Sequence, residues 1–174
     1  MLSASTLLSA QDFVREIDRE SGRISLHGKV SFKDIENEAS YTWFKKGVAN
    51  YKPNAAAVKE LADLWPNYRF VVFGATWCDD SKDLLPKFYK TAQQAMIDKH
   101  AIEMYAVNRD KESLELEHRF YNISRVPTFI IMHQHREVGR IVESVSDSVE
   151  EEIVRILQKD TQYLKRKAAE EAAQ

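Results

Sequence analysis

The only cysteine of this 174-residue chain, Cys78, is its strongest candidate for covalent chemistry. It follows an apolar run at residues 70–73, where β-branched and aromatic side chains predict a buried strand, and a helical pattern begins a few residues later. At such a strand-to-helix turn, free N–H groups and the positive end of the helix dipole face the sulfur and favour the thiolate. Because the thiolate is the reactive form of cysteine, Cys78 is the candidate nucleophile.

Other kinds of catalytic site find little support in the sequence. A metal site would have to combine Cys78 with His133 and His135, and the i, i+2 spacing of these histidines places both on one face of a strand away from the cysteine. We therefore predict no metal site. The sequence shows no serine nucleophile elbow, glycine-rich phosphate loop or paired-carboxylate arrangement. The remaining histidines are isolated and receive no role: His27, His100 and His118.

The elements that must position Cys78 follow the order β-α-β-α-β-β-α in the second part of the chain. Strands are expected at residues 69–75, 102–107, 129–132 and 137–143, and helices at residues 81–97, 112–120 and from Ser146 or Asp147 onward. Pro86 is expected to bend the first of these helices, because proline removes one backbone hydrogen bond. Cys78 then lies between a central strand and a long helix.

The first part of the chain is predicted to be mostly helical. Helices are expected at residues 11–21, 31–48 and 55–65, with a short strand at residues 24–26. The first helix depends on the spacing of Phe13, Val14 and Ile17, and Asn54 is the expected N-cap of the last. We predict a helical N-terminal extension at residues 1–66, a main domain at residues 67–160 and a charged helical tail at residues 161–174.

The composition is that of an ordinary globular protein, with 44% hydrophobic and 30% charged residues. A formal net charge of -2 gives no electrostatic reason to expect nucleic acid as a partner, and no apolar run approaches the length of a membrane span. We place the protein in the cytoplasm. If residues 2–11, which have the small and apolar character of the end of a secretory signal, are the remnant of one, the alternative is the bacterial periplasm.

The residues around Cys78 resemble the active-site turn of the thioredoxin family. The sequence Trp77-Cys78-x-x-Ser81-Lys82 matches that turn and the start of its helix, except that Ser81 stands in place of the family's second cysteine. The resemblance implies that Cys78 attacks a substrate disulfide. Ser81 cannot displace sulfur from sulfur, but we expect its hydroxyl to donate a hydrogen bond to the Cys78 thiolate and so stabilise it. No cofactor is implied, and glutathione is a candidate co-substrate.

A second motif, at residues 121–128, resembles the family's cis-proline loop. It ends in Val126-Pro127-Thr128 and precedes a predicted hairpin. The resemblance implies that the Pro127 peptide bond is cis, that the Val126 backbone lies beside the sulfur, and that Trp77 forms an apolar rim. The substrate-binding candidates are therefore Trp77, Val126, Pro127 and Thr128. The resemblance covers residues 69–160 and implies an α/β thioredoxin-like fold, a central mixed sheet flanked by helices.

Some residues depart from the family pattern. Asp79 and Asp80 follow the cysteine directly, and their charges disfavour a nearby thiolate. Val72 stands at the strand position where dithiol thioredoxins keep a buried acid, which serves the attack by the second thiol. The loss of both the second cysteine and this acid is consistent with a protein that no longer performs that step.

Two functions remain open after this comparison. In the first, the protein is a single-cysteine disulfide oxidoreductase or isomerase, whose mixed disulfides with protein or peptide thiols are resolved by an external thiol. In the second, it is a non-catalytic binding module that captures partner proteins through the surface around Trp77 and Pro127. A thioredoxin-fold peroxidase fits less well, because the residues before Cys78 do not match the Pro-x-x-x-Thr-x-x-Cys run of those enzymes.

Overall fold

A computed structural model describes residues 12–173 of the chain, in which six strands form one mixed sheet. The sheet order is β1-β2-β4-β3-β5-β6, and β3 is parallel to β4 while every other neighbouring pair is antiparallel. The strands are β1 (Phe13–Ile17), β2 (Ile24–Val30), β3 (Tyr68–Gly74), β4 (Ile102–Ala106), β5 (Thr128–His133) and β6 (Arg136–Val142). Helices flank this sheet, so the predicted fold class is confirmed.

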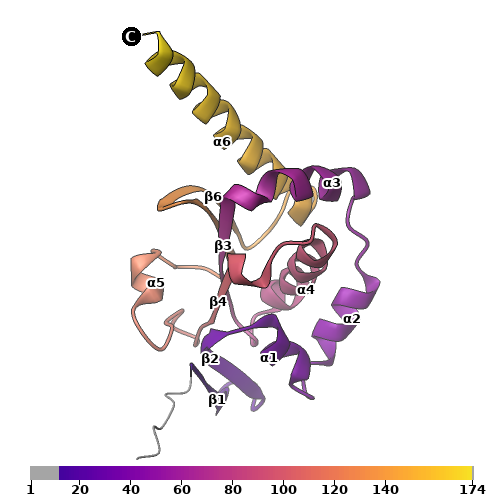
Figure 1. Ribbon diagram of the computed structural model, residues 1–174. Helices are drawn as coiled ribbons and strands as arrows, with labels where there is room; N and C mark the ends of the chain where they lie inside the picture. Colours follow the sequence, from indigo (N-terminus) through magenta and orange to yellow (C-terminus); the bar gives the residue numbers. More distant parts are fainter. Residues whose placement is uncertain (1–11, 174) are drawn as a thin grey trace, which may run out of the picture.

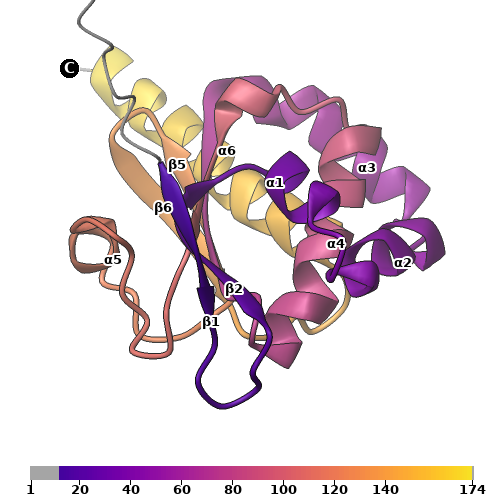
Figure 2. The ribbon, with the colours of Figure 1, turned by 90° about the horizontal axis from the view of Figure 1, so that it is seen from below.

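The two faces of the sheet are covered unequally. Most helices lie on one face, and the single short helix α5 (Glu117–Phe120) lies on the other (Figures 1 and 2). Phe88 is fully buried at the centre of the larger core, with its ring centroid 5.8 Å from that of Phe70 and 5.0 Å from that of Phe129. The helices of this larger layer are α1 (Phe32–Asn37), α2 (Thr42–Asn50), α3 (Ala55–Leu64), α4 (Asp79–Gln94) and α6 (Val149–Ala172).

The central strand β3 and the helix α4 that follows it carry the cysteine. All residues of β3 except Arg69 are buried, because the strand lies between β4 and β5 with side chains packed on both faces. Helix α4 continues through Pro86, which lies against Gly47 of α2. A Cβ atom at Gly47 would lie 2.6 Å from the Pro86 Cβ atom, so the close approach of these two helices requires glycine.

The predicted helix at residues 11–21 is wrong, because this segment forms strand β1; Gln11 itself lies outside the described residues. Phe13, Val14 and Ile17 have a spacing that fits a helix, but the segment pairs with β2 as an antiparallel hairpin. Val14 and Ile17 are left 38% and 64% exposed, so their spacing does not mark a buried face. The N-terminal part therefore contributes two strands to the sheet as well as three helices.

Three predicted helices also differ in their limits. The helix expected at residues 31–48 is two helices, because the backbone becomes extended at Glu38, which ends α1. The helix expected at residues 112–120 is only the four residues of α5, since residues 112–116 form bends and irregular backbone. Ser148, rather than Ser146 or Asp147, caps α6. The end of α6 projects beyond the body of the protein (Figure 1), and α3 begins after Asn54 as predicted.

Candidate active site

Cys78 lies between β3 and α4, at the N-cap position of the helix. Its backbone is extended (φ -89°, ψ 130°), its N–H donates to the Ala75 carbonyl (3.1 Å), and its carbonyl accepts from the Lys82 N–H (3.0 Å). The side chain is partly exposed and forms no disulfide. The sulfur is therefore fixed at the positive end of the α4 dipole and is open to a reactant.

The loop before β5 meets the cysteine from the other side. The Val126–Pro127 peptide bond is cis, and the Cys78 thiol donates a hydrogen bond to the Val126 carbonyl, with 3.4 Å between sulfur and oxygen. Val126 is buried, with 4% of its surface exposed, and Pro127 is also buried. The structure thus brings together two sequence segments that are almost fifty positions apart.

Ser81 and Thr128 support the backbone around the site. Ser81 is fully buried, and its hydroxyl oxygen accepts a hydrogen bond from the Ala75 N–H (3.1 Å). Within residues 12–173 no hydrogen bond joins Ser81 to Cys78, so the expected stabilisation of the sulfur by this hydroxyl is not found. The Thr128 hydroxyl donates to the Arg125 carbonyl (2.7 Å) from a buried position. Both side chains hold turns in place, because their oxygen atoms are engaged by the chain itself.

Trp77 is held more firmly than a simple apolar rim requires. Its indole N–H donates to the Val107 carbonyl (3.0 Å), and the guanidinium carbon of Arg109 lies 4.9 Å from the ring centroid. A guanidinium over an indole face is attracted by the ring quadrupole. The surface beside Cys78 is therefore an aromatic ring covered on one face by a cation.

Arg109 is itself fixed by the turn between β1 and β2. Its Nε and Nη2 atoms donate to the two carboxylate oxygens of Asp18 at 2.7 and 2.8 Å, and Glu20 lies against Nη1. The hydrogen bonds from Arg109 and then Ser21, against a smaller opposing effect of burial, hold the pKa of Asp18 well below its ordinary value. The same contact raises the pKa of Arg109. The N-terminal hairpin thus reaches the active-site surface through a buried carboxylate.

A second contact ties the hairpin to the cysteine turn itself. The Thr76 hydroxyl oxygen accepts from the Leu26 N–H (3.2 Å) and lies 3.2 Å from the Ser25 hydroxyl. No role was predicted from the sequence for Asp18, Thr76 or Arg109. The partners are 50 or more positions apart and form no motif, and a polar turn at residues 18–22 is the only local signal.

The acidic residues after Cys78 are partly compensated. The Lys82 ammonium donates to Asp79 (2.7 Å), and this hydrogen bond lowers the pKa of the Asp79 carboxyl. Val72 is fully buried in the helix-side core, where an acid would have no counter-charge. His133 pairs with Asp160 (3.0 Å) at the end of β5 remote from Cys78. Among residues 12–173, no cluster of His, Cys, Asp or Glu could hold a metal ion, and no helix is long and apolar enough to cross a bilayer.

Comparisons with known proteins identify the family of the chain. The family model described as Thioredoxin matches residues 57–159, more than half of the chain. A crystal structure of a protein of unknown function from Pseudomonas aeruginosa is 18% identical, with 71% of this chain and 76% of that chain covered and a TM-score of 0.49. An HIV epitope-scaffold is 19% identical, with 67% and 73% covered and a TM-score of 0.47. None of the curated proteins compared with the chain matches it.

Proposed function

The chain belongs to the thioredoxin family, and we propose that it is a thiol–disulfide exchange protein that uses Cys78 as its single nucleophile. The observation that carries the proposal is the position of the sulfur, 3.4 Å from the Val126 carbonyl oxygen and at the first turn of α4. The side chain is partly exposed, so a disulfide can approach it. A lone structural cysteine would have no need for this combination of access, helix N-terminus and adjoining backbone.

The exchange needs two steps. In the first, the Cys78 thiolate attacks one sulfur of a substrate disulfide; a bond forms between Cys78 and that sulfur, and the other sulfur leaves as a thiolate. In the second, an external thiol such as glutathione attacks the mixed disulfide as its thiolate. It forms a new disulfide with the substrate sulfur and releases the Cys78 thiolate. Ser81 takes no part in either bond change.

The Val126 carbonyl gives the site a means of holding a peptide. In the free protein this oxygen accepts the thiol hydrogen of Cys78. Once the sulfur has lost its proton and bonded to a substrate, the oxygen is available to a backbone N–H of an extended peptide. We therefore propose disulfides and thiols of proteins or peptides as the substrates, with Trp77 bordering the bound segment.

The test is the intact mass of the protein after incubation with glutathione disulfide, followed by reduced glutathione. We expect one glutathione adduct, removed by the reduced thiol, and no adduct on a Cys78→Ala variant. This variant should keep the fold, since the Cys78 side chain is partly exposed at the edge of a core cluster and the change to alanine removes only its sulfur. An unreactive Cys78 in the folded protein, reactive only after denaturation, would overturn the proposal.

A second candidate function is a binding module without turnover. It is favoured by the engagement of the Ser81 oxygen and by the apolar Val72, because neither supplies a group for resolving a mixed disulfide. A binding module would capture a partner equally well with or without reduced glutathione and with Cys78 replaced by alanine. The exchange protein would release its partner on addition of the thiol.

A further inference from the structure

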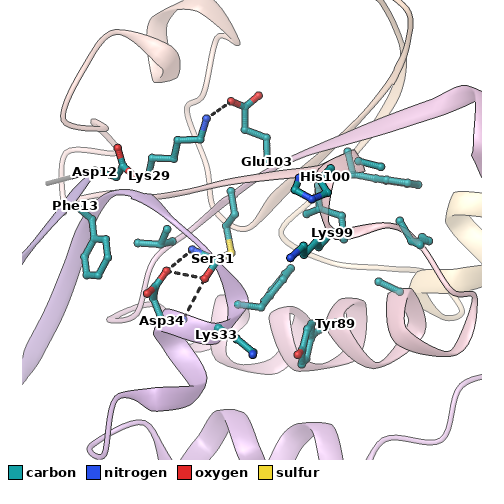
Figure 3. Close-up of a pocket in the computed structure, with 18 of the residues that line it drawn as sticks. Asp12, Phe13, Lys29, Ser31, Lys33, Asp34, Tyr89, Lys99, His100 and Glu103 are labelled. Carbon is teal, nitrogen blue, oxygen red and sulfur yellow. Dashed lines mark hydrogen bonds and ion pairs between the residues drawn. The ribbon is translucent and has the colours of Figure 1, made fainter. Parts of the chain in front are cut away.

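A pocket of about 1290 Å³ lies at the end of the sheet remote from Cys78. It arises because β2 pairs with β4 only at Met104–Ala106, after which the chain turns away into α1. The first two residues of β4, Ile102 and Glu103, therefore have no neighbouring strand on that side within the described chain. Residues 12–15, the start of α1, the end of α4 and the short helix η2 (Lys99–Ala101) surround the opening (Figure 3).

Apolar side chains form about half of the lining of the pocket. Phe70 and Met104 are buried core residues, and Phe13, Tyr89 and Ile102 are partly exposed at the opening. Covering partly exposed aromatic and aliphatic side chains in a concave surface with an apolar group is favourable, because it removes their surface from water. The pocket therefore favours a ligand with an apolar body.

Two of the three carboxylates of the pocket are already engaged, and the third, Asp12, has no side-chain partner among residues 12–173. Glu103 accepts a hydrogen bond from the Lys29 ammonium (2.7 Å), and this bond, together with the nearby charge of Asp12, raises the pKa of Lys29 against the effect of burial. The Asp34 carboxylate accepts from the N–H (2.7 Å) and hydroxyl (2.6 Å) of Ser31, which closes the capping box of α1. Glu103 and Asp34 therefore already have hydrogen-bond donors and do not require a bound cation.

Three basic side chains of the pocket, in contrast, have no such partner. Lys33, Lys99 and His100 form no ion pair or side-chain hydrogen bond with any residue from 12 to 173. They come from α1 and η2 and are drawn around the opening near Tyr89 of α4, away from Asp12 (Figure 3). The two unpaired ammonium groups outnumber the one unpaired carboxylate, Asp12, so the unpaired charge of the pocket is positive although the whole chain has a formal net charge of -2.

We propose that this pocket binds an amphipathic organic anion, a small carboxylate whose apolar body lies against Phe13 and Tyr89 and whose head group lies between Lys33 and Lys99. A simple inorganic anion would leave the apolar side chains of the pocket exposed to water. An amphipathic cation would cover them, but the unpaired ammonium groups would repel its charge. A carboxylate with an alkyl or aryl body satisfies both parts of the surface. The site is separate from Cys78, because the two lie beyond opposite ends of β3.

Titration of the full chain with decanoate, followed by the backbone amide shifts of the ¹⁵N-labelled protein, tests the proposal. We expect saturable shifts at pocket residues such as Ile102 and Tyr89, with little change at Cys78. Acetate has the same head group without the body, and decyltrimethylammonium has the body with the opposite charge. Both should bind at least tenfold more weakly than decanoate.

A pair of variants separates the charge of the pocket from the charge of the protein. Lys33→Gln combined with Lys99→Gln should weaken decanoate binding by about threefold to tenfold, since exposed ion pairs contribute modestly. Lys45→Gln combined with Lys46→Gln, which changes two exposed lysines of α2 outside the pocket, should leave the affinity unchanged. Shifts that do not saturate, equal binding of the cationic probe, or equal losses in the two double variants would each overturn the proposal.

Discussion

Replacing Ser81 by cysteine should allow an intramolecular disulfide with Cys78. The two residues lie three positions apart at the start of α4. Side chains at this spacing in a helix have Cβ atoms about 5–6 Å apart, whereas a disulfide needs about 3.5–4.5 Å. The two Cβ atoms must therefore move closer together by roughly 1–2 Å. The N-cap position of Cys78 permits it, because its extended backbone lies outside the regular helix.

The reduced Ser81→Cys variant should be less stable than the natural chain. Ser81 is fully buried and accepts the Ala75 N–H at 3.1 Å, and sulfur is a weaker acceptor. Loss of this hydrogen bond costs about 0.5–1.5 kcal/mol, and the larger atom in a closed site adds about 1–3 kcal/mol. The disulfide closes a very short loop, for which chain entropy predicts a gain of about 2 kcal/mol. The oxidised variant should therefore recover about half or more of the loss.

The assay is mild oxidation followed by denaturation, treatment with a maleimide and measurement of the intact mass, because a thiol at the buried position 81 is not accessible in the folded protein. The oxidised variant should lose two hydrogens and take up no maleimide, and after reduction it should take up two. Urea unfolding of both forms then gives the free energy of unfolding for each. A Cys78→Ser, Ser81→Cys chain is the matched control, since it keeps the buried sulfur without a partner.

Two free thiols after oxidation, both alkylated by the maleimide once the protein is denatured, would refute the predicted disulfide. That result would mean that the cysteine turn does not have the geometry in which Ser81 stands in the place of a second cysteine. An oxidised form less stable than the reduced form would refute the expected stabilisation by the disulfide, because strain in the turn would then exceed the gain from restricting the unfolded chain.

Three further changes test the surroundings of the site. Asp18→Asn should flatten the pH dependence of the free energy of unfolding below about pH 4. The Arg109 contact holds the pKa of Asp18 low, so in the natural chain the stabilising charge of this carboxylate is lost as the pH falls. If urea unfolding gives the same change of this free energy with pH for both chains, the prediction is contradicted. Glu150→Gln should lower the free energy of unfolding by about 2–3 kcal/mol, since the buried carboxylate accepts from the Asn54 N–H (2.7 Å) and two hydroxyl groups. Phe88→Ala should lower it by about 3–5 kcal/mol through the cavity left among aromatic rings, and a loss below 1 kcal/mol would mean that the core collapses around the gap.

Most elements after residue 67 could be predicted from the sequence because their apolar periods are long and bounded by clear turns. The failures occur where a side chain or a distant strand decides the backbone. The Asn108 amide oxygen accepts from the Asp110 and Glu112 N–H groups, which makes a turn where Leu114 and Leu116 suggested a helix. In the hairpin, Asp18 and Arg23 pair through their backbones, a contact that hydrophobic spacing does not reveal.

In the candidate site, too, the residues in local motifs could be predicted from the sequence, and those positioned by distant contacts could not. Trp77, Cys78 and the segment around Pro127 were predicted because each sits in a short motif on a recognisable element. The expected hydrogen bond from Ser81 to the cysteine is not found among residues 12–173; the buried hydroxyl oxygen accepts instead from the Ala75 N–H. Arg109 was missed, since its partner Asp18 is 91 positions away and only the folded hairpin brings them together.

The hairpin of β1 and β2 links the two sites that the structure assigns. Its turn holds Arg109 over Trp77 through Asp18, and the residues at the start of β1 form one wall of the pocket. The hairpin lies before residue 57, where the match to the thioredoxin family begins. The matched part supplies the thiol and the cis-proline loop, on which the proposed exchange depends. The features that can distinguish one partner from another, the cation on the tryptophan and the basic pocket, depend on the part of the chain outside that match.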